Sequence, residues 1–241
     1  MIRKLAISAA IVIGSASWVS TPAHALVIST NGSLSSSGAA SQIIVAPPNV
    51  NDDAAFNNSI QAFNEAVGHS LTANLAVDGG FITAGTRVDS HMIFLNSGPG
   101  NSSTLIEHGA GGNQNAASFT FDGLILGVMS TSNGSFEVAS SSFLGAAGTI
   151  YPLATFSARG MEGDPLDGNK NNDWYALAGS TINLGMRVTE PGDWIRVITV
   201  SQASSGPSPV PIPAIFPIFA AVMGLFGFVG WRKRRRAIAV A

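Results

Sequence analysis

The 241-residue chain contains no cysteine, and only 11% of its residues are charged. The lack of cysteine excludes disulfides, thiolate catalysis and cysteine-based metal sites, so the fold must be stabilised by a packed core. The sequence also lacks three common enzyme motifs: the G-x-S-x-G elbow, the H-E-x-x-H helix and the G-x-x-x-x-G-K-[ST] phosphate loop. We therefore predict that the chain is not an enzyme.

The N-terminus has the pattern of a secretory signal peptide. Two basic residues precede an apolar stretch from Leu5 to Ile13, and the small residues Ala23 and Ala25 mark a cleavage site for signal peptidase. The apolar stretch is too short to span a bilayer. We therefore predict a cleaved signal peptide over residues 1–25.

The longest stretch without charge runs from Ile212 to Trp231. In a helix these residues reach about 30 Å, the thickness of the hydrocarbon core of a bilayer. Pro213 and Pro217 fall in the first turns, where missing amide protons cost least. We predict a transmembrane helix over about 213–231. A cytoplasmic C-terminus is predicted by the five cations that follow, Arg232, Lys233, Arg234, Arg235 and Arg236.

This C-terminal arrangement resembles the PEP-CTERM sorting tail, which combines a short proline-containing motif, one transmembrane helix and a terminal arginine cluster. Val210, Pro211, Pro213 and Ala214 match a V-P-x-P-A form, and Ile212 stands where the commonest form has glutamate. The resemblance implies processing by an exosortase of a Gram-negative bacterium, which cuts near the motif and releases or transfers the protein to the cell surface. An ordinary single-pass anchor is the alternative interpretation.

Charge is distributed unevenly between these ends and the rest of the chain. Without them, five basic residues remain against fourteen acidic ones, a formal net charge of −9. No basic patch is then available to neutralise phosphates, so we expect no binding to nucleic acid. The expected partners are signal peptidase, exosortase, the inner membrane and, outside the cell, exopolysaccharide.

Short apolar stretches between turn residues predict an all-β ectodomain. The fold that we expect is a β-sandwich, with a jelly-roll-like variant second and a barrel third. Asn133-Gly134 is typical of a two-residue turn and predicts a hairpin over residues 124–140, and Pro191-Gly192 predicts a type II turn with positive φ at the glycine. Strands are predicted at 60–67, 71–77, 87–95, 119–121, 124–129, 136–139, 151–158, 181–189 and 194–200.

The predicted domain organisation follows from these segments. The signal peptide over 1–25 precedes a single ectodomain over 26–201, a size sufficient for one hydrophobic core. A Ser/Gly/Pro linker over 202–209 then joins the ectodomain to the sorting tail over 210–241.

An acidic, amide-rich loop is the strongest local candidate for a binding site. Hard oxygen ligands at alternating positions are what Ca²⁺ requires, so we predict a calcium loop, with a solvated polar turn as the alternative. An EF-hand is excluded because Asn172 stands where its glycine would be and Ala178 where its closing glutamate would be. The candidate ligands are Asp164, Asp167, Asn169, Asn171 and Asp173.

Arg87, Asp89 and His91 alternate along one predicted strand, so their side chains project from one face. They form either a ligand-binding row or part of a metal site, or else a solvated or ion-paired face. Trp174 and Trp194 are the tryptophans available for stacking on sugars, unless both belong to the core.

Three function classes remain open. The first is an exosortase-sorted surface or matrix protein of structural or adhesive type, exported through the inner membrane, held there transiently and then transferred to the surface. The second is a carbohydrate-binding module of an exopolysaccharide layer, and the third is a secreted hydrolase.

Overall fold

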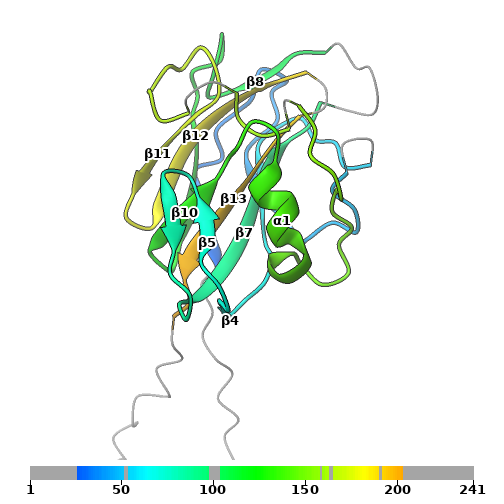
Figure 1. Cartoon of the computed structure of the whole chain (residues 1–241). Coiled ribbons are helices and arrows are strands. Elements are labelled where there is room, and N and C mark those ends of the chain that lie inside the picture. Colours follow the sequence, from blue (N-terminus) through cyan, green and yellow to red (C-terminus); the bar gives the residue numbers. More distant parts are fainter. Residues whose placement is uncertain are drawn as a thin grey trace, which may run out of the picture. The chain divides into compact units, whose positions relative to one another are not determined.

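The computed structural model describes residues 26–51, 54–97, 104–157, 159–162, 165–189 and 192–202 (Figure 1). The predicted signal peptide, most of the linker and the sorting tail lie outside this part of the chain. Among the described residues, no helix is long and apolar enough to cross a membrane.

β-strands are the main secondary structure of the described residues, which confirms the predicted β-rich fold. The first sheet has the order β1-β9-β12-β11, and β8 also pairs with β12. Its strands are β1 (Val27–Thr30), β8 (Ile106–His108), β9 (Ala117–Phe121), β11 (Trp174–Ala178) and β12 (Thr181–Val188).

The second sheet has the order β10-β13-β7-β3-β2, and β4 also pairs with β7. Its strands are β2 (Gln42–Ile43), β3 (Gln61–Asn64), β4 (His69–Ser70), β7 (Arg87–Leu95), β10 (Ile125–Met129) and β13 (Asp193–Val200). A small hairpin and one helix complete the described fold: β5 (Leu75–Val77), β6 (Gly80–Ile82) and α1 (Ser135–Leu144). β2 and β3 pair in parallel, and the other described pairings are antiparallel.

A hydrophobic core takes side chains from both larger sheets. Alternate residues of β12 from Ile182 to Val188 face this core, and so do Ile195 and Val197 of β13. β12 and β13 are consecutive in the chain but belong to different sheets, so the chain changes sheet between them. Gly192 in this connection has φ 91°, the positive value predicted for a glycine after proline.

The second sheet is packed on both faces. On the face away from the first sheet, Val88 of β7 and Ile198 of β13 join a cluster with Leu144 of α1 and with the β5–β6 hairpin (Figure 1). A further cluster on β7 includes Met92 and Phe94. Eight of the nine residues of β7 are therefore buried, and this sheet is the middle layer of the domain.

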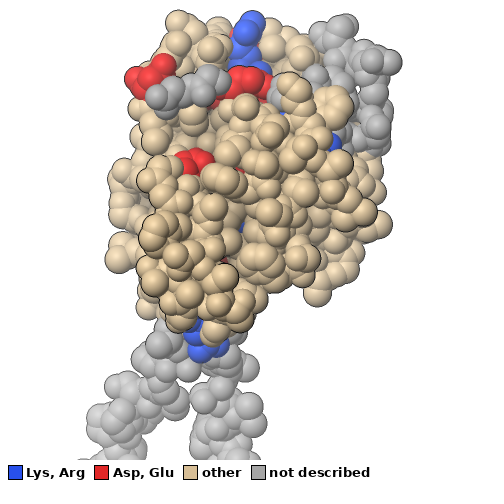
Figure 2. Space-filling model, in the orientation of Figure 1, with Lys and Arg blue, Asp and Glu red and all other residues tan. Residues whose placement is uncertain are grey.

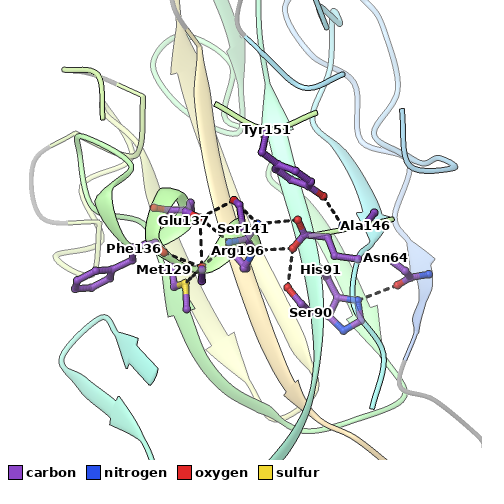
Figure 3. Close-up of polar contacts among 12 residues, drawn as sticks. Asn64, Ser90, His91, Met129, Phe136, Glu137, Ser141, Ala146, Tyr151 and Arg196 are labelled. Atoms are coloured by element: carbon purple, nitrogen blue, oxygen red, sulfur yellow. Dashed lines mark hydrogen bonds and ion pairs between the residues drawn. The ribbon is translucent and has the colours of Figure 1, made fainter. Parts of the chain in front are cut away.

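The middle layer contains a fully buried ion pair between Arg196 of β13 and Glu65, which follows β3 (Figure 3). Nε and Nη2 of Arg196 donate to the two carboxylate oxygens of Glu65 at 2.7 and 2.8 Å. The remaining donors reach α1, at the carbonyl of Glu137 (2.9 Å) and the hydroxyls of Ser140 and Ser141 (2.5 and 3.2 Å). All five guanidinium N–H groups therefore have acceptors.

β7, which lies between β13 and β3 in the sheet, also bonds to the Arg196–Glu65 ion pair. Ser90 of β7 donates its hydroxyl to Oε2 of Glu65 at 2.6 Å. Burial is the largest single effect on the pKa of Arg196 and lowers it, but the charge and hydrogen bonds of Glu65, together with the charges of Tyr151 and Glu137, outweigh burial and raise this pKa, so the guanidinium stays protonated. The ion pair thus joins β3, β7, β13 and α1.

The predicted hairpin over residues 124–140 is wrong. β10 pairs with β13, and the residues after Gly134 form α1. Gly134 has the expected positive φ, 66°, but it precedes a helix: Asn133 Oδ1 accepts the N–H of Ser135 at 3.1 Å, and the Gly134 carbonyl accepts the N–H of Val138 at 3.0 Å. A helix is favoured here because the buried side chains recur every three or four residues, at Glu137, Ser140 and Leu144.

The predicted strand over 151–158 is also wrong, because residues 151–157 contain no strand. Tyr151 is instead a core residue beside the ion pair, with its ring centroid 5.7 Å from the Arg196 guanidinium carbon and its hydroxyl accepting the N–H of Ala146 at 2.8 Å. At 71–77 only β5 forms, whereas the strands predicted at 60–67, 87–95, 181–189 and 194–200 are confirmed by β3, β7, β12 and β13.

Arg196→Met should destabilise the domain strongly, because it leaves the Glu65 carboxylate charged and buried without its partner. We expect the free energy of unfolding, measured by urea denaturation, to fall by about 3–5 kcal/mol. The control is Arg187→Met, which breaks the more exposed pair with Glu107 and should cost about 0–1 kcal/mol. Equal losses in the two variants would contradict this role of Arg196.

Candidate functional site

The structure separates the residues of the predicted calcium loop. Asp167, Asn169 and Asn171 are exposed and bond within the loop: Asp167 Oδ1 accepts the N–H of Asn169 at 2.6 Å, and Asn169 Oδ1 accepts the N–H of Asn171 at 3.2 Å. Asp173 is buried, and Asp164 lies outside the described residues. The loop thus folds through local side-chain turns, and Asp173 points away from it into the domain.

Asp173 meets two other carboxylates, those of Glu162 and Asp193. One carboxylate oxygen of each lies within 4.8 Å of the others. Asp193 is the first residue of β13, Asp173 immediately precedes β11, and Glu162 lies in the segment before the loop. We refer to Glu162, Asp173 and Asp193 as the carboxylate triad. It brings together residues that are 11 to 31 positions apart in the sequence.

Backbone donors hold Asp173 in place. Its Oδ1 accepts the N–H of Arg187 in β12 at 2.7 Å, and its Oδ2 accepts the N–H of Glu162 at 3.1 Å. The second bond also fixes the backbone that carries the Glu162 carboxyl. Asp193 is only 2% exposed, and its Oδ2 accepts no hydrogen bond from any described residue.

The triad is electrostatically strained when no cation is bound. Burial, followed by the charges of Asp173 and Glu162, raises the pKa of Asp193 well above its ordinary value. Burial and the neighbouring Asp173 also raise the pKa of Glu162, to about 7. Like charges at this distance disfavour full ionisation, so the triad needs either protons or a cation.

Sequence reasoning included Asp173 and missed its two partners. Glu162 lies at the edge of the acidic stretch, and Asp193 directly follows the predicted Pro191-Gly192 turn. The available signal was an acidic residue at the start of the largely apolar strand Asp193–Val200, a position that becomes buried once the strand joins the middle sheet.

A surface cavity of about 540 Å³ lies beside the β5–β6 turn. Asp78 in this turn accepts hydrogen bonds from the hydroxyls of Ser130 (2.7 Å) and Tyr175 (2.9 Å), which tie the hairpin to the residue after β10 and to β11. Hydroxyl, carboxylate and apolar groups thus share one hollow, of a size that admits a small polar ligand. Its lining includes Asp78, Ser130, Thr131, Ser132, Phe136 and Tyr175.

The row Arg87, Asp89 and His91 does not form a solvated strand face. Arg87 is exposed, but Asp89 and His91 are fully buried. Asp89 accepts the backbone N–H of Gly68, and the His91 ring lies between Asn64 Oδ1 (2.8 Å) and Thr199 Oγ1 (3.0 Å). Asp89 and His91 thus have polar partners inside the domain, and Trp174 and Trp194 are buried as well.

Ser33 and His108 are in contact, as a serine hydrolase would require, but the ring proton of His108 is on the nitrogen that would have to accept the serine proton. Nδ1 of His108 accepts the backbone N–H of Ile60 at 3.0 Å, so the ring proton sits on Nε2. Nε2 therefore donates to Ser33 Oγ, 2.7 Å away, and cannot accept the hydroxyl proton. A serine nucleophile needs the opposite arrangement, so this pair is structural.

Comparisons with known protein families, with curated proteins and with solved structures find no match for this chain.

His108 should make the domain sensitive to acid. Burial lowers its pKa to about 4, so the folded state keeps the ring neutral while the unfolded state takes up a proton below about 6.5. Stability is therefore lost as the pH falls from about 6.5 to about 4. His108→Asn keeps an acceptor for Ile60 and cannot be protonated; we expect this variant to lose roughly 2–3 kcal/mol less over that interval, measured by urea denaturation at each pH.

The matched control is His69→Asn, because His69 is only half-buried and lies at the edge of the second sheet. This variant should keep the acid sensitivity that His108 confers. If His108→Asn also follows the wild-type profile, acid sensitivity does not originate at His108.

Proposed function

We propose that the chain is an exported surface protein of structural or adhesive type that an exosortase sorts through its C-terminal tail. The observation that carries this proposal is the order V-P-I-P-A, uncharged stretch and five cations at 210–236. In the sequence, the Ser/Gly/Pro-rich stretch 202–209 separates the motif, which begins at Val210, from the last described strand, which ends at Val200. Such a position suits access by a membrane protease.

The proposed ectodomain is a β-sandwich of jelly-roll-like type. Two observations support it. The two larger sheets share one core, and the chain changes repeatedly from one sheet to the other, for example between β7 and β8, between β9 and β10, and between β12 and β13. The face shown in Figure 2 is largely uncharged, with acidic and basic side chains confined to small groups. A surface of this kind suits a neutral polymer environment better than nucleic acid.

The sorting step predicts a defined difference in mass. In cells with an exosortase, the mature protein should begin at Leu26 and lack the residues after the cleaved motif, whereas cells without the enzyme should retain the tail to Ala241. Intact-mass spectrometry of membrane and medium fractions measures both ends. Pro213→Ala should reduce cleavage, and Pro207→Ala in the linker should not. A tail that is intact in both strains would show an ordinary anchor.

The cavity supports a second candidate function, binding of a carbohydrate from the surrounding exopolysaccharide. Hydroxyl and carboxylate groups beside Phe136 and Tyr175 offer hydrogen bonds and aromatic contact to a sugar. The two mature tryptophans are buried and contribute no stacking platform. The cavity is therefore the part of the described surface that this function would use.

Ser132→Trp tests the second candidate, because a large side chain there fills the cavity from an exposed position. Glycan-array binding by the wild type should fall at least tenfold in this variant, equivalent to about 1.4 kcal/mol. Ser142→Trp is the control, since Ser142 is exposed on α1 and does not line the cavity. Equal binding by the two variants would place any glycan site elsewhere.

A further inference from the structure

The carboxylate triad is the most unusual polar cluster among the described residues, because it gathers acidic groups without neutralising them. Asp173 receives two hydrogen bonds from neutral backbone N–H groups, which position it but do not cancel its charge. The charges that act on Asp193 are those of Asp173 and Glu162, which are both negative. Such a cluster is costly to bury by itself.

An independent observation shows that the cluster has an unfilled bonding position. Asp193 is almost completely buried, directs one carboxylate oxygen to the other two residues, and has no described hydrogen-bond donor for Oδ2. Buried carboxylate oxygens normally have a donor or a metal ion. A cation bound in the triad would provide a partner for this buried carboxylate.

Three cations in neighbouring segments are engaged elsewhere. Arg187 contributes its backbone N–H to Asp173, but its Nε donates to Glu107 Oε1 at 3.0 Å. The Nζ of Lys170 lies 4.8 Å from the centroid of the Trp174 ring. The Arg159 guanidinium carbon lies 5.3 Å from the centroid of the Trp194 ring, and its Nη1 donates to the Ala154 carbonyl. The charges that act on Asp193 and Glu162 are those of carboxylates, so none of these three side chains neutralises the triad.

We propose that Glu162, Asp173 and Asp193 bind a calcium ion. The ligands are oxygen atoms only, which favours hard cations over zinc or copper. Three oxygens that lie within 4.8 Å of one another are each within about 2.8 Å of a common point, so a shift of a few tenths of an ångström brings all three to the 2.3–2.6 Å of a calcium ion. Calcium is preferred to magnesium because its coordination is flexible, and carboxylates from separate segments seldom meet a strict octahedral geometry.

This site differs from the calcium loop that the sequence predicts. It keeps Asp173 and replaces the exposed Asp167, Asn169 and Asn171 by Glu162 and Asp193. The bound ion would connect the start of β13, the start of β11 and the segment before the loop. The site does not depend on the sorting proposal, because it lies wholly within the folded ectodomain.

The test uses the purified full chain in detergent, with calcium alone as the ligand. We expect calcium at about a hundred times its dissociation constant to raise the melting temperature by about 5–10 °C relative to chelator. Asp193→Asn should abolish this rise because it removes a charged ligand while preserving shape. Asp167→Asn is the matched control: it preserves the loop turn and should leave the rise unchanged.

Terbium luminescence provides a readout that does not depend on stability. Trp194 follows Asp193 directly, so bound terbium should show emission sensitised by tryptophan, and calcium should displace it. If Asp193→Asn does not fold, Glu162→Gln at the half-buried position replaces it. The proposal is overturned if the wild type shows neither a melting shift nor sensitised emission at millimolar ion, or if the shift is lost in Asp167→Asn and kept in Asp193→Asn.

Discussion

The structure depends on one desolvated interaction, the ion pair between Arg196 and Glu65 in the middle layer. A buried guanidinium requires an acceptor for each of its five N–H groups, and Glu65 provides two of them. The other three acceptors come from α1, in the carbonyl of Glu137 and the hydroxyls of Ser140 and Ser141. The position of α1 on the sheet is therefore fixed by the need to satisfy Arg196 as well as by apolar contact.

This constraint explains why some sequence predictions succeeded and others did not. The alternating patterns of β12 and β13 were readable because one face of each meets the core between the sheets. The pattern around Arg87, Asp89 and His91 was misread because both faces of the second sheet are covered. An alternating pattern shows that a strand has two faces, but residues distant in the sequence decide whether each face is covered by another layer.

The helix α1 and the carboxylate triad both show what a local sequence pattern leaves undecided. Positive φ at Gly134 was correctly predicted, but both a hairpin and a helix start can use it, and the residues that follow bury one helical face, at Glu137, Ser140 and Leu144. Local acidic density drew attention to the loop at 164–173, whereas metal binding requires closeness in space. Asp193 lies outside this loop in the sequence, and the meeting of β13 with the segment at 162 could not be inferred from spacing.

In a chain without cysteine, the Arg196–Glu65 ion pair and the carboxylate triad have complementary roles. A disulfide would hold distant segments together in any compartment outside the cytoplasm, and this chain has none. The Arg196–Glu65 pair is complete within the chain, so it stabilises the domain wherever it folds. The triad lacks its positive charge, and a divalent ion can supply that charge only where the ion is plentiful. In the folded domain without a bound ion, repulsion among the three carboxylates opposes closure of the segments that carry them, and the calcium ion that we propose would replace this repulsion by attraction to one shared charge.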